Sequence, residues 1–345
     1  MTSLRKFANI LAASAALTAS CVATASASTV EDFYKGKTIN ILVGFTTGNG
    51  ADSYARLIAR WYSKYAPGAP NVIVQNMPGS GSLTMTNNLY NVAAKDGTVF
   101  GIFNRNVPLE ALMGNANARF DPRKFTWLGS TNTEPSLCVS WHSSPVKSIA
   151  DLQGREFAVA ATGLNANSGL VPTVLNRVMG AKFKVIMGYP GSNEMSLALE
   201  RGEVEGRCGW SRSSLMATKP QWASEKKINL LLQAGLQKSP LMPEVPLAMD
   251  SVKGEADRQL LKLAVAWDEM AWPFAAPPDI PADRAKALRG AFEAVLKDPE
   301  LVTQAKREGL DLNYVAPAQI ARILDEVYAT PEPIIATLKG IVRAK

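Results

Sequence analysis

The fold of this chain is decided by residues 39–65, which read INILVGFTTGNGADSYARLIARWYSKY. The stretch opens with mostly apolar, β-favouring residues at 39–43, which predict a buried strand. A polar, glycine-rich loop follows, and then apolar side chains recur on one helical face at Tyr54, Leu57, Ile58, Trp61, Tyr62 and Tyr65. This spacing predicts an amphipathic helix that ends before Pro67. A strand that leads through a glycine loop into a helix is the repeating unit of parallel α/β sheets.

The same pattern of strand, loop and helix repeats along the chain. The first half continues with strands at 72–74 and 99–103 and a helix at 83–94. A second unit carries strands at 137–141, 157–161, 185–187, 204–208 and 228–232, with helices at 170–179 and 195–201. An extended segment at 271–276 precedes helices at 282–296, 299–308 and 317–328. We therefore expect two α/β domains, the second inserted into the first, with the C-terminal helices returning to the first domain.

Composition narrows the class of protein. The chain has 345 residues, 47% of them hydrophobic, which is enough for about two domains. The formal charge is +7, but the basic residues are dispersed and no aromatic residues interleave with a basic run, so we expect no nucleic-acid partner. The single histidine, His142, leaves little room for a metal site, and no cofactor or metal is expected.

The N-terminus has the three parts of a secretory signal peptide. Arg5 and Lys6 precede a charge-free stretch at 7–30, which contains Ala-Ser-Ala at 25–27. We predict that residues 1–27 are a signal peptide cleaved after Ala27, and that the mature protein is periplasmic. A membrane anchor is disfavoured because the stretch carries many serines and threonines. A lipoprotein modified at Cys21 stays open as an alternative, although Thr18 stands where such signals usually carry an aliphatic residue.

Cleavage would leave a mature chain of charge +5 with two cysteines, Cys138 and Cys208. In an oxidising compartment the two could form a disulfide. The alternative, which the sequence slightly favours, is that they are two small, buried side chains. The sequence leaves both possibilities open.

Two loops share one design. Residues 46–51 and 162–168 each follow a strand, open a helix and are rich in Gly, Asn, Ser and Thr. A helix N-terminus presents unpaired N–H groups and a partial positive charge, so two such loops that face each other would suit a small anion. The alternative is a pair of ordinary turns capped by Asp52 or Ser53 and by Asn167 or Ser168. The matched pair favours binding.

No catalytic motif of the common kinds occurs in the chain. There is no G-x-S-x-G or H-E-x-x-H sequence, and we expect no enzymatic activity. A hydrolase that uses His142 with Ser143 or Ser144 remains the less favoured alternative. Trp210, between Arg207 and Arg212, either stacks on a ligand or packs in the core.

Several short motifs, in this order and spacing, resemble those of the periplasmic substrate-binding proteins of tripartite tricarboxylate transporters, also called Bug receptors. The similarity covers nearly all of the mature chain, from Tyr34 to about Leu312. The motifs are residues 41–48 with Asp52, 55–57, 76–81, 96–98, 120–122 with Phe125, 188–192 and 202–205.

The resemblance implies a type II periplasmic-binding-protein fold, with two α/β lobes joined by two crossover strands and a ligand cleft between them. Lobe one would comprise residues 28–143 and 262–345, and lobe two residues 144–261. It implies a monomeric receptor that binds a small carboxylate and delivers it to the permease subunits of a membrane transporter. A module that senses the ligand for a membrane kinase would share the same binding event.

Carried over position by position, the resemblance also implies a set of ligand contacts. These are Phe45, Thr46, Thr47, Gly48, Gly50, Ala51 and Asp52 in lobe one, and Gly163, Asn165, Asn167, Ser168, Tyr189 and Ser192 in lobe two, to which we add Trp210. Many members of the family carry an acidic residue after the strand that begins near Val204. This chain has Gly209 and Trp210 there instead. An acid would suit a ligand amine, so its absence favours a plain carboxylate, including an aromatic one, over an amino acid.

Overall fold

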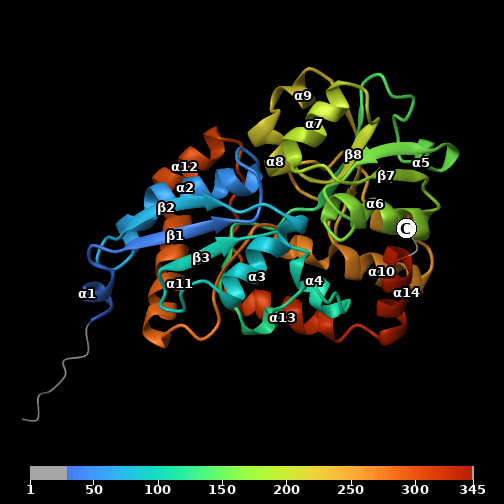
Figure 1. Ribbon diagram of the computed structural model, residues 1–345. Helices are drawn as coiled ribbons and strands as arrows, with labels where there is room; N and C mark the ends of the chain where they lie inside the picture. The colour runs from blue at the N-terminus through green and yellow to red at the C-terminus, as the bar shows by residue number, and fades with distance from the viewer. Residues whose placement is uncertain (1–28, 344–345) are drawn as a thin grey trace, which may run out of the picture.

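The computed structural model describes residues 29–343, which form two lobes, each built on a five-stranded sheet (Figure 1). The predicted signal peptide and Cys21 lie outside the described residues. The first sheet has the order β2 (Asn71–Asn76), β1 (Thr38–Val43), β3 (Val99–Ile102), β10 (Pro273–Ala276) and β4 (Thr126–Ser130). The second has the order β7 (Phe183–Ile186), β6 (Phe157–Ala160), β8 (Gly206–Ser211), β5 (Ser136–Trp141) and β9 (Ile228–Ala234). The predicted α/β fold with two lobes is confirmed.

The two sheets follow one plan. In the first, β1 pairs in parallel with β2 and β3, and β10 runs antiparallel between β3 and β4. In the second, β6 pairs in parallel with β7 and β8, and β5 runs antiparallel between β8 and β9. The arrowheads of β1 and β3 point toward the second lobe in Figure 1. Loops that follow these strands therefore lie near the space between the lobes, where open α/β sheets bind ligands.

Helices cover both faces of each sheet. The first lobe carries α1 (Val30–Tyr34), α2 (Gly50–Tyr65), α3 (Leu83–Asn91), α4 (Val107–Leu112), α11 (Ala282–Lys297), α12 (Pro299–Arg307) and α13 (Pro317–Tyr328). The second carries α5 (Asp151–Gly154), α6 (Asn167–Met179), α7 (Ser192–Glu200), α8 (Arg212–Thr218), α9 (Gln221–Ser224), α10 (Glu255–Val265) and α14 (Glu332–Arg343). Within residues 29–343, none of the helices has the length and apolar character needed to cross a bilayer.

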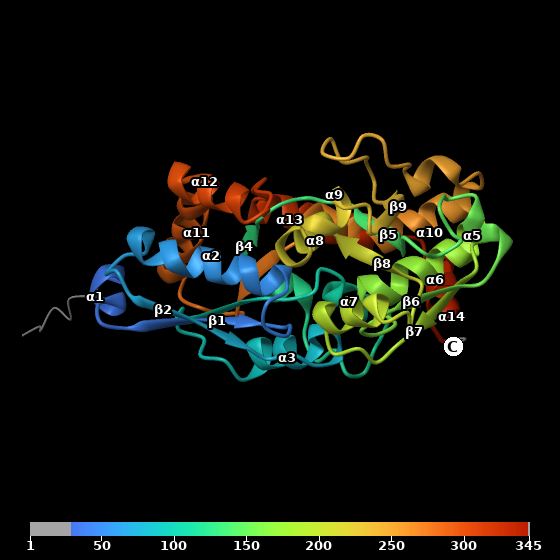
Figure 2. The same ribbon diagram turned by 90° about the horizontal axis from the view of Figure 1, so that it is seen from above.

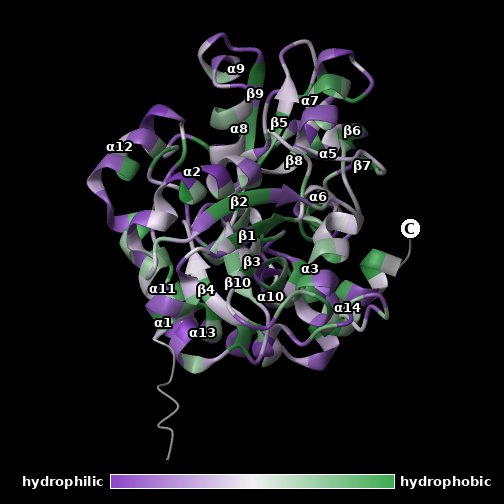
Figure 3. Cartoon of the chain, turned by 60° about the vertical axis from the view of Figure 1, so that its left-hand side comes forward, coloured by the Kyte–Doolittle hydropathy of each residue, from purple (hydrophilic) through white to green (hydrophobic). Residues whose placement is uncertain are grey.

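The helix predicted from the opening stretch is α2, and its apolar face enters the core of the first lobe. Tyr54, Leu57, Ile58 and Tyr62 are fully buried, where α2 packs against β2 and α11. Figure 3 shows the helices banded in hydrophilic and hydrophobic colours, as amphipathic helices are. This packing fixes the position of the loop that precedes α2.

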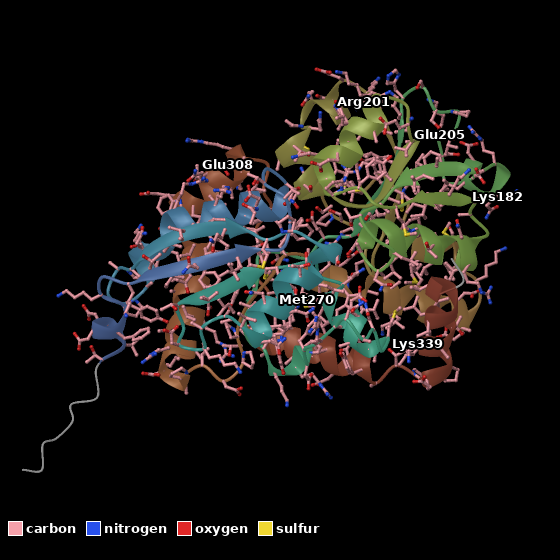
Figure 4. All side chains as sticks on the ribbon, viewed as in Figure 1. Lys182, Arg201, Glu205, Met270, Glu308 and Lys339 are labelled. Atoms are coloured by element: carbon pink, nitrogen blue, oxygen red, sulfur yellow. A yellow bond between two sulfur atoms is a disulfide. The ribbon has the colours of Figure 1, made fainter. Side chains whose placement is uncertain are left out.

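Within residues 29–343 the chain crosses between the lobes three times, and two of the crossing segments run side by side. The segment between β4 and β5 runs along a 3₁₀ helix, η4 (Ala266–Met270), that leads into β10. Three backbone hydrogen bonds join them. Thr131 N–H donates to the Trp272 carbonyl (3.2 Å), Ala271 N–H to the Asn132 carbonyl (3.0 Å) and Glu134 N–H to the Asp268 carbonyl (3.1 Å). Met270, labelled in Figure 4, is fully buried between the lobes. The crossing segments thus form one hydrogen-bonded hinge.

The predicted lobe boundaries need correction. Strand β5 pairs with β8 and β9 of the second sheet, so the second lobe begins before Ser136 and not at residue 144. The predicted return of 262–345 to lobe one fails for α14, which packs against α6 and α10 of the second lobe. Figures 1 and 2 both show this last helix beside α6. The apolar residues Ile335, Leu338 and Val342 are buried there, which is why α14 leaves the first lobe.

Candidate functional site

A cavity lies between the two lobes, with a volume of about 610 Å³ including its open mouth. From the first lobe and the hinge it is lined by Phe45, Asn49, Asn104, Arg105, Ala271 and Trp272. From the second lobe it is lined by Thr162, Asn167, Ser168, Gly191, Ser192, Met195, Arg207, Gly209, Trp210, Ser211 and Ser214. Within the described part of the chain, the lining includes two arginines and no carboxylate side chain. Its charge therefore favours an anion.

The N-terminus of α6 forms part of the wall. Its first residues, Asn167 and Ser168, line the cavity, and a helix leaves its first N–H groups without intrahelical partners. The Ser168 hydroxyl accepts a hydrogen bond from Thr162 N–H (3.1 Å), which holds the loop closed over the helix end. The first turn contains no acidic residue. The positive end of the helix dipole is thus available to a ligand.

Strand β8 passes directly beneath this helix end. Gly209 has φ +67°, and a Cβ there would lie 2.1 Å from the Asn167 carbonyl oxygen. Two residues of β8, Cys208 and Gly209, lie opposite Cys138 of β5, which is a β-bulge. The bulge lies within β8, which continues to Ser211, past the predicted end at 208, and so includes Trp210. In the structure Cys138 and Cys208 form a disulfide across these two strands.

Arg207 is a buried cation on this wall, with a side chain that is 3% exposed. Its Nη1 donates to the Ser192 carbonyl (3.1 Å) and Ser196 Oγ (2.7 Å), and its Nη2 donates to Ser192 Oγ (2.8 Å). The guanidinium carbon lies 3.8 Å from the centre of the Trp210 ring, a cation–π contact. Among the ion pairs of residues 29–343, none includes Arg207. Burial lowers its pKa to about 9, so it remains charged at neutral pH.

Trp210 is itself 3% exposed, and its Nε1 is buried without a hydrogen-bond partner. Buried indole N–H groups usually find a partner, so an unpartnered one in a cavity wall points to a ligand acceptor. Both the cation and the indole donor lie on one strand. The second lobe thus presents an unsatisfied positive surface to the cavity.

Arg105 is the second arginine, and it differs from Arg207 because it has a counter-ion. Its Nε lies 2.8 Å from Asp268 Oδ1, and both side chains are buried. Asp268 also accepts hydrogen bonds from Ser136 N–H (3.0 Å) and Asn167 Nδ2 (3.2 Å). Burial raises the pKa of Asp268 to about 7, and the Arg105 charge opposes that rise. Through its hydrogen bonds this pair joins the loop after β3, η4, β5 and α6, and so ties both lobes to the hinge.

Most of the predicted contacts in the first lobe organise the loop. Asn49 Oδ1 accepts from Asp52 N–H (3.1 Å), and Asp52 Oδ2 accepts from Gly48 N–H (2.8 Å) and Arg56 Nε (2.9 Å). Gly50 packs so closely that a Cβ would lie 3.0 Å from Ser214 Cβ. Ala51 is buried in the core of the first lobe. Of the seven predicted contacts in this loop, only Phe45 lines the cavity, together with Asn49, which was not predicted.

The remaining predicted residues separate into four groups. Asn167, Ser168, Ser192 and Trp210 line the cavity with Phe45. Thr46 and Tyr189 line an adjoining groove beside residues 78–82. Thr47 and Asn165 contact the opposite lobe: the Thr47 carbonyl accepts from Asn193 Nδ2 (3.3 Å), and Asn165 Nδ2 donates to Glu110 Oε2 (2.7 Å). Gly163 lies behind the α6 end, close to Gly169.

The sequence-based set omitted much of the wall. It did not include Asn49, Asn104, Arg105, Thr162, Met195, Arg207, Ser211, Ser214 or Trp272. Arg207 carried a usable signal, since it stands inside an apolar strand two residues before Gly209. The sequence around Arg105 and Trp272 gave no such signal, because their positions in the cavity wall depend on packing between residues far apart in sequence.

His142 and its neighbours lie away from the cavity, at the end of β5. The His142 and Ser143 side chains are exposed. The Ser144 hydroxyl donates to Glu205 Oε2 (3.2 Å) and accepts from Val146 N–H (3.2 Å). Within residues 29–343, no cluster of three or more His, Cys, Asp or Glu side chains could hold a metal ion.

Comparison with known proteins finds no matching family model and no matching curated protein. Solved structures do match. The periplasmic binding protein BugD is 18% identical, with a TM-score of 0.72 over 89% of this chain and 98% of that one. A TctC solute binding protein from Polaromonas is 18% identical, with a TM-score of 0.61 over 90% and 100%. MatC from Rhodopseudomonas palustris, solved with bound malate, is 19% identical, with a TM-score of 0.68 over 89% and 99%.

These similarities extend over nearly the whole of each chain and confirm the predicted resemblance in fold. The similar structures are binding proteins rather than enzymes. At this level of identity they establish a shared architecture of two lobes.

Proposed function

We propose that this protein is an extracytoplasmic solute receptor that binds a small carboxylate in the cavity between its lobes. The observation that carries the proposal is the wall of that cavity, where the α6 N-terminus and the unpaired Arg207 lie together. A buried charge without a counter-ion is costly, and an anion in the cavity would supply the missing partner. Two similar structures, MatC with bound malate and Rpa4515 with adipate, agree with a carboxylate ligand.

Binding would be coupled to closure of the lobes. The cavity is lined from both sides, so a ligand gains its full set of contacts only when the lobes are together. Contacts across the cleft are already present in Asn193 with Thr47 and Asn165 with Glu110. The hinge supplies the axis of motion, as in other proteins that close two domains around a ligand.

Delivery to a membrane permease of the tripartite tricarboxylate type is the downstream role that the sequence motifs imply. The exported, periplasmic location rests on the signal at residues 1–27, and mass spectrometry of the exported chain should find Ser28 at its N-terminus. We expect a monomer. A sensory role for the same binding event would be indicated by co-purification with a kinase ectodomain and not with permease subunits.

A thermal-shift screen of ligand-free residues 28–345 tests the binding function. Carboxylates, aromatic carboxylates and amino acids are compared at equal concentration. A ligand at 100 times its Kd stabilises the folded state by about 2.7 kcal/mol, which gives a clear rise in Tm. The absence of a shift with every carboxylate, on protein shown to be folded, would reject the receptor function.

A further inference from the structure

Resting on the proposed function, we infer that Arg207 is the specificity-determining residue of the cavity and that it selects a monocarboxylate with an uncharged, apolar body. The carboxylate would lie against Arg207 and the Trp210 indole N–H, and the body of the ligand against the aromatic wall.

The donors of Arg207 leave one edge of its guanidinium free. The group has five N–H donors. Three of them are used. Both N–H groups of Nη1 donate, one to the Ser192 carbonyl and one to Ser196 Oγ. One N–H of Nη2 donates to Ser192 Oγ, on the side that faces Nη1. The two left over are Nε–H and the second Nη2–H, which point along the same edge. That edge binds a carboxylate through two parallel hydrogen bonds.

The orientation of this edge is fixed before any ligand arrives. Ser192 and Ser196 hold one side of the guanidinium, and the Trp210 ring lies against its face at 3.8 Å. All three partners are neutral, so they position the charge without cancelling it. Glu194, the acid nearest to Ser192 in the sequence, forms no ion pair with Arg207, and its Oε2 lies beside Gly191 and Thr46.

The charge balance of the cavity selects the class of ligand. Arg105 has Asp268 as its ion-pair partner, so within the described residues Arg207 is the arginine of the lining that has no such partner. A single carboxylate balances it. The ammonium group of an amino acid would find no carboxylate in the lining itself, although Glu194 Oε2 lies just behind Gly191. The second charge of a dicarboxylate would find only Arg105, whose Nη1 is buried without a hydrogen-bond partner but whose charge already faces Asp268.

The remaining wall suits an apolar body. The cavity is also lined by four large apolar side chains, those of Phe45, Met195, Trp210 and Trp272. The rings of Phe45 and Trp272 meet edge to face, with their centroids 6.2 Å apart. Aromatic and alkyl groups gain most from such a surface. Benzoate and hexanoate are therefore suitable probes.

Calorimetric titration of the ligand-free mature chain compares four probes: benzoate, hexanoate, succinate and phenylalanine. We expect benzoate and hexanoate to bind, and succinate and phenylalanine to bind at least about tenfold more weakly. Tightest binding of succinate or phenylalanine would overturn the inference and leave the receptor function standing. Failure of all four probes would also overturn the inference, and the thermal-shift screen of carboxylates then decides the receptor function separately.

Variants test the role of Arg207 directly. Losing a charge-assisted hydrogen bond corresponds to a fall in affinity of roughly 10- to 150-fold, and we expect Arg207→Gln to weaken benzoate binding by that factor. Arg207→Lys keeps the charge but not the paired donors, so its loss should be intermediate. Arg201→Gln is the control, because Arg201 is an exposed arginine at the end of α7 and is labelled in Figure 4. Equal benzoate affinity in Arg207→Gln and wild type would overturn the inference.

Trp210→Phe keeps an aromatic ring under the guanidinium and removes only the indole N–H. We expect a loss of benzoate affinity of roughly 2- to 10-fold, as for one neutral hydrogen bond. This variant also decides the case if circular dichroism shows that both Arg207 variants are misfolded. An unchanged affinity in folded Trp210→Phe would then count against the inferred anion position.

Discussion

Gly209 allows the α6 N-terminus to lie on strand β8, and replacing it with alanine should disturb both the fold and the cavity. Its φ of +67° is a left-handed conformation, which costs an alanine about 1–2 kcal/mol. The added Cβ would also lie 2.1 Å from the Asn167 carbonyl oxygen and 2.6 Å from Ser168 N, both of them backbone atoms. One of the two elements must therefore move.

Gly180 separates the two effects. It has the same φ of +67°, as the residue that ends α6, but a Cβ there would meet nothing within 4 Å. Gly180→Ala should therefore cost only the conformational term, about 1–2 kcal/mol. Displacing packed backbone typically adds about 1–3 kcal/mol, so Gly209→Ala should lower the free energy of unfolding by about 2–5 kcal/mol.

Urea unfolding followed by circular dichroism measures both variants, and calorimetry then measures their affinity for benzoate. We expect Gly180→Ala to bind like the wild type, because its site is at the far end of α6. Gly209→Ala should bind more weakly, since the helix end and Trp210 shift together. Equal unfolding free energies for the two variants, within about 0.5 kcal/mol, would refute the close approach of β8 and α6.

Two further predictions concern the hinge and the C-terminal helix. Burial raises the pKa of Asp268 from 3.8 to about 7, so between these pH values the folded protein binds the proton more tightly than the unfolded chain. The free energy of unfolding of the wild type should therefore fall as pH rises from 4 to 7. The fall should be smaller in Asp268→Asn, which has no carboxyl group to titrate. If the urea midpoints of the two proteins changed with pH in parallel, this prediction would be contradicted. Leu338→Ala should cost about 2–5 kcal/mol, because Leu338 is fully buried where α14 meets the second lobe. Thr337 is exposed on the same helix, so Thr337→Ala should change the free energy of unfolding by no more than about 0.5 kcal/mol. Similar urea midpoints for Leu338→Ala and Thr337→Ala would count against the docking of α14.

Local periodicity was sufficient to predict most of the secondary structure. The apolar stripe of α2 and the alternation of strands and helices each depend on residues close in sequence. Helix α14 also carried such a stripe, in Ile335, Leu338 and Val342, and could have been found. Its place on the second lobe could not, because nothing within the helix says which apolar surface it will cover.

The site was only partly predictable, for a similar reason. Thr162, Asn167 and Ser168 of the loop at 162–168 line the cavity, and their position could be expected because the loop after a parallel strand lies at a known edge of the sheet. Arg105 and Asp268 are far apart in sequence, and their ion pair exists only once the hinge has formed. The bulge at Gly209 also breaks the alternation of β8, so simple strand counting could not place Arg207 and Trp210 together on the cavity wall.

The two loops predicted to act alike differ in one residue that decides their charge. Asp52 lies in the first turn of α2, where hydrogen bonds from Arg56, Gly48 N–H and Asn76 outweigh the effect of burial and hold its pKa below the ordinary value. An ionised carboxylate there offsets the positive end of the helix dipole. The first turn of α6 has no acid, and Arg207 lies close by on β8. In the proposed receptor, an anion between the lobes would therefore be attracted mainly by the second lobe, and the first lobe would close over it with Phe45 and Trp272.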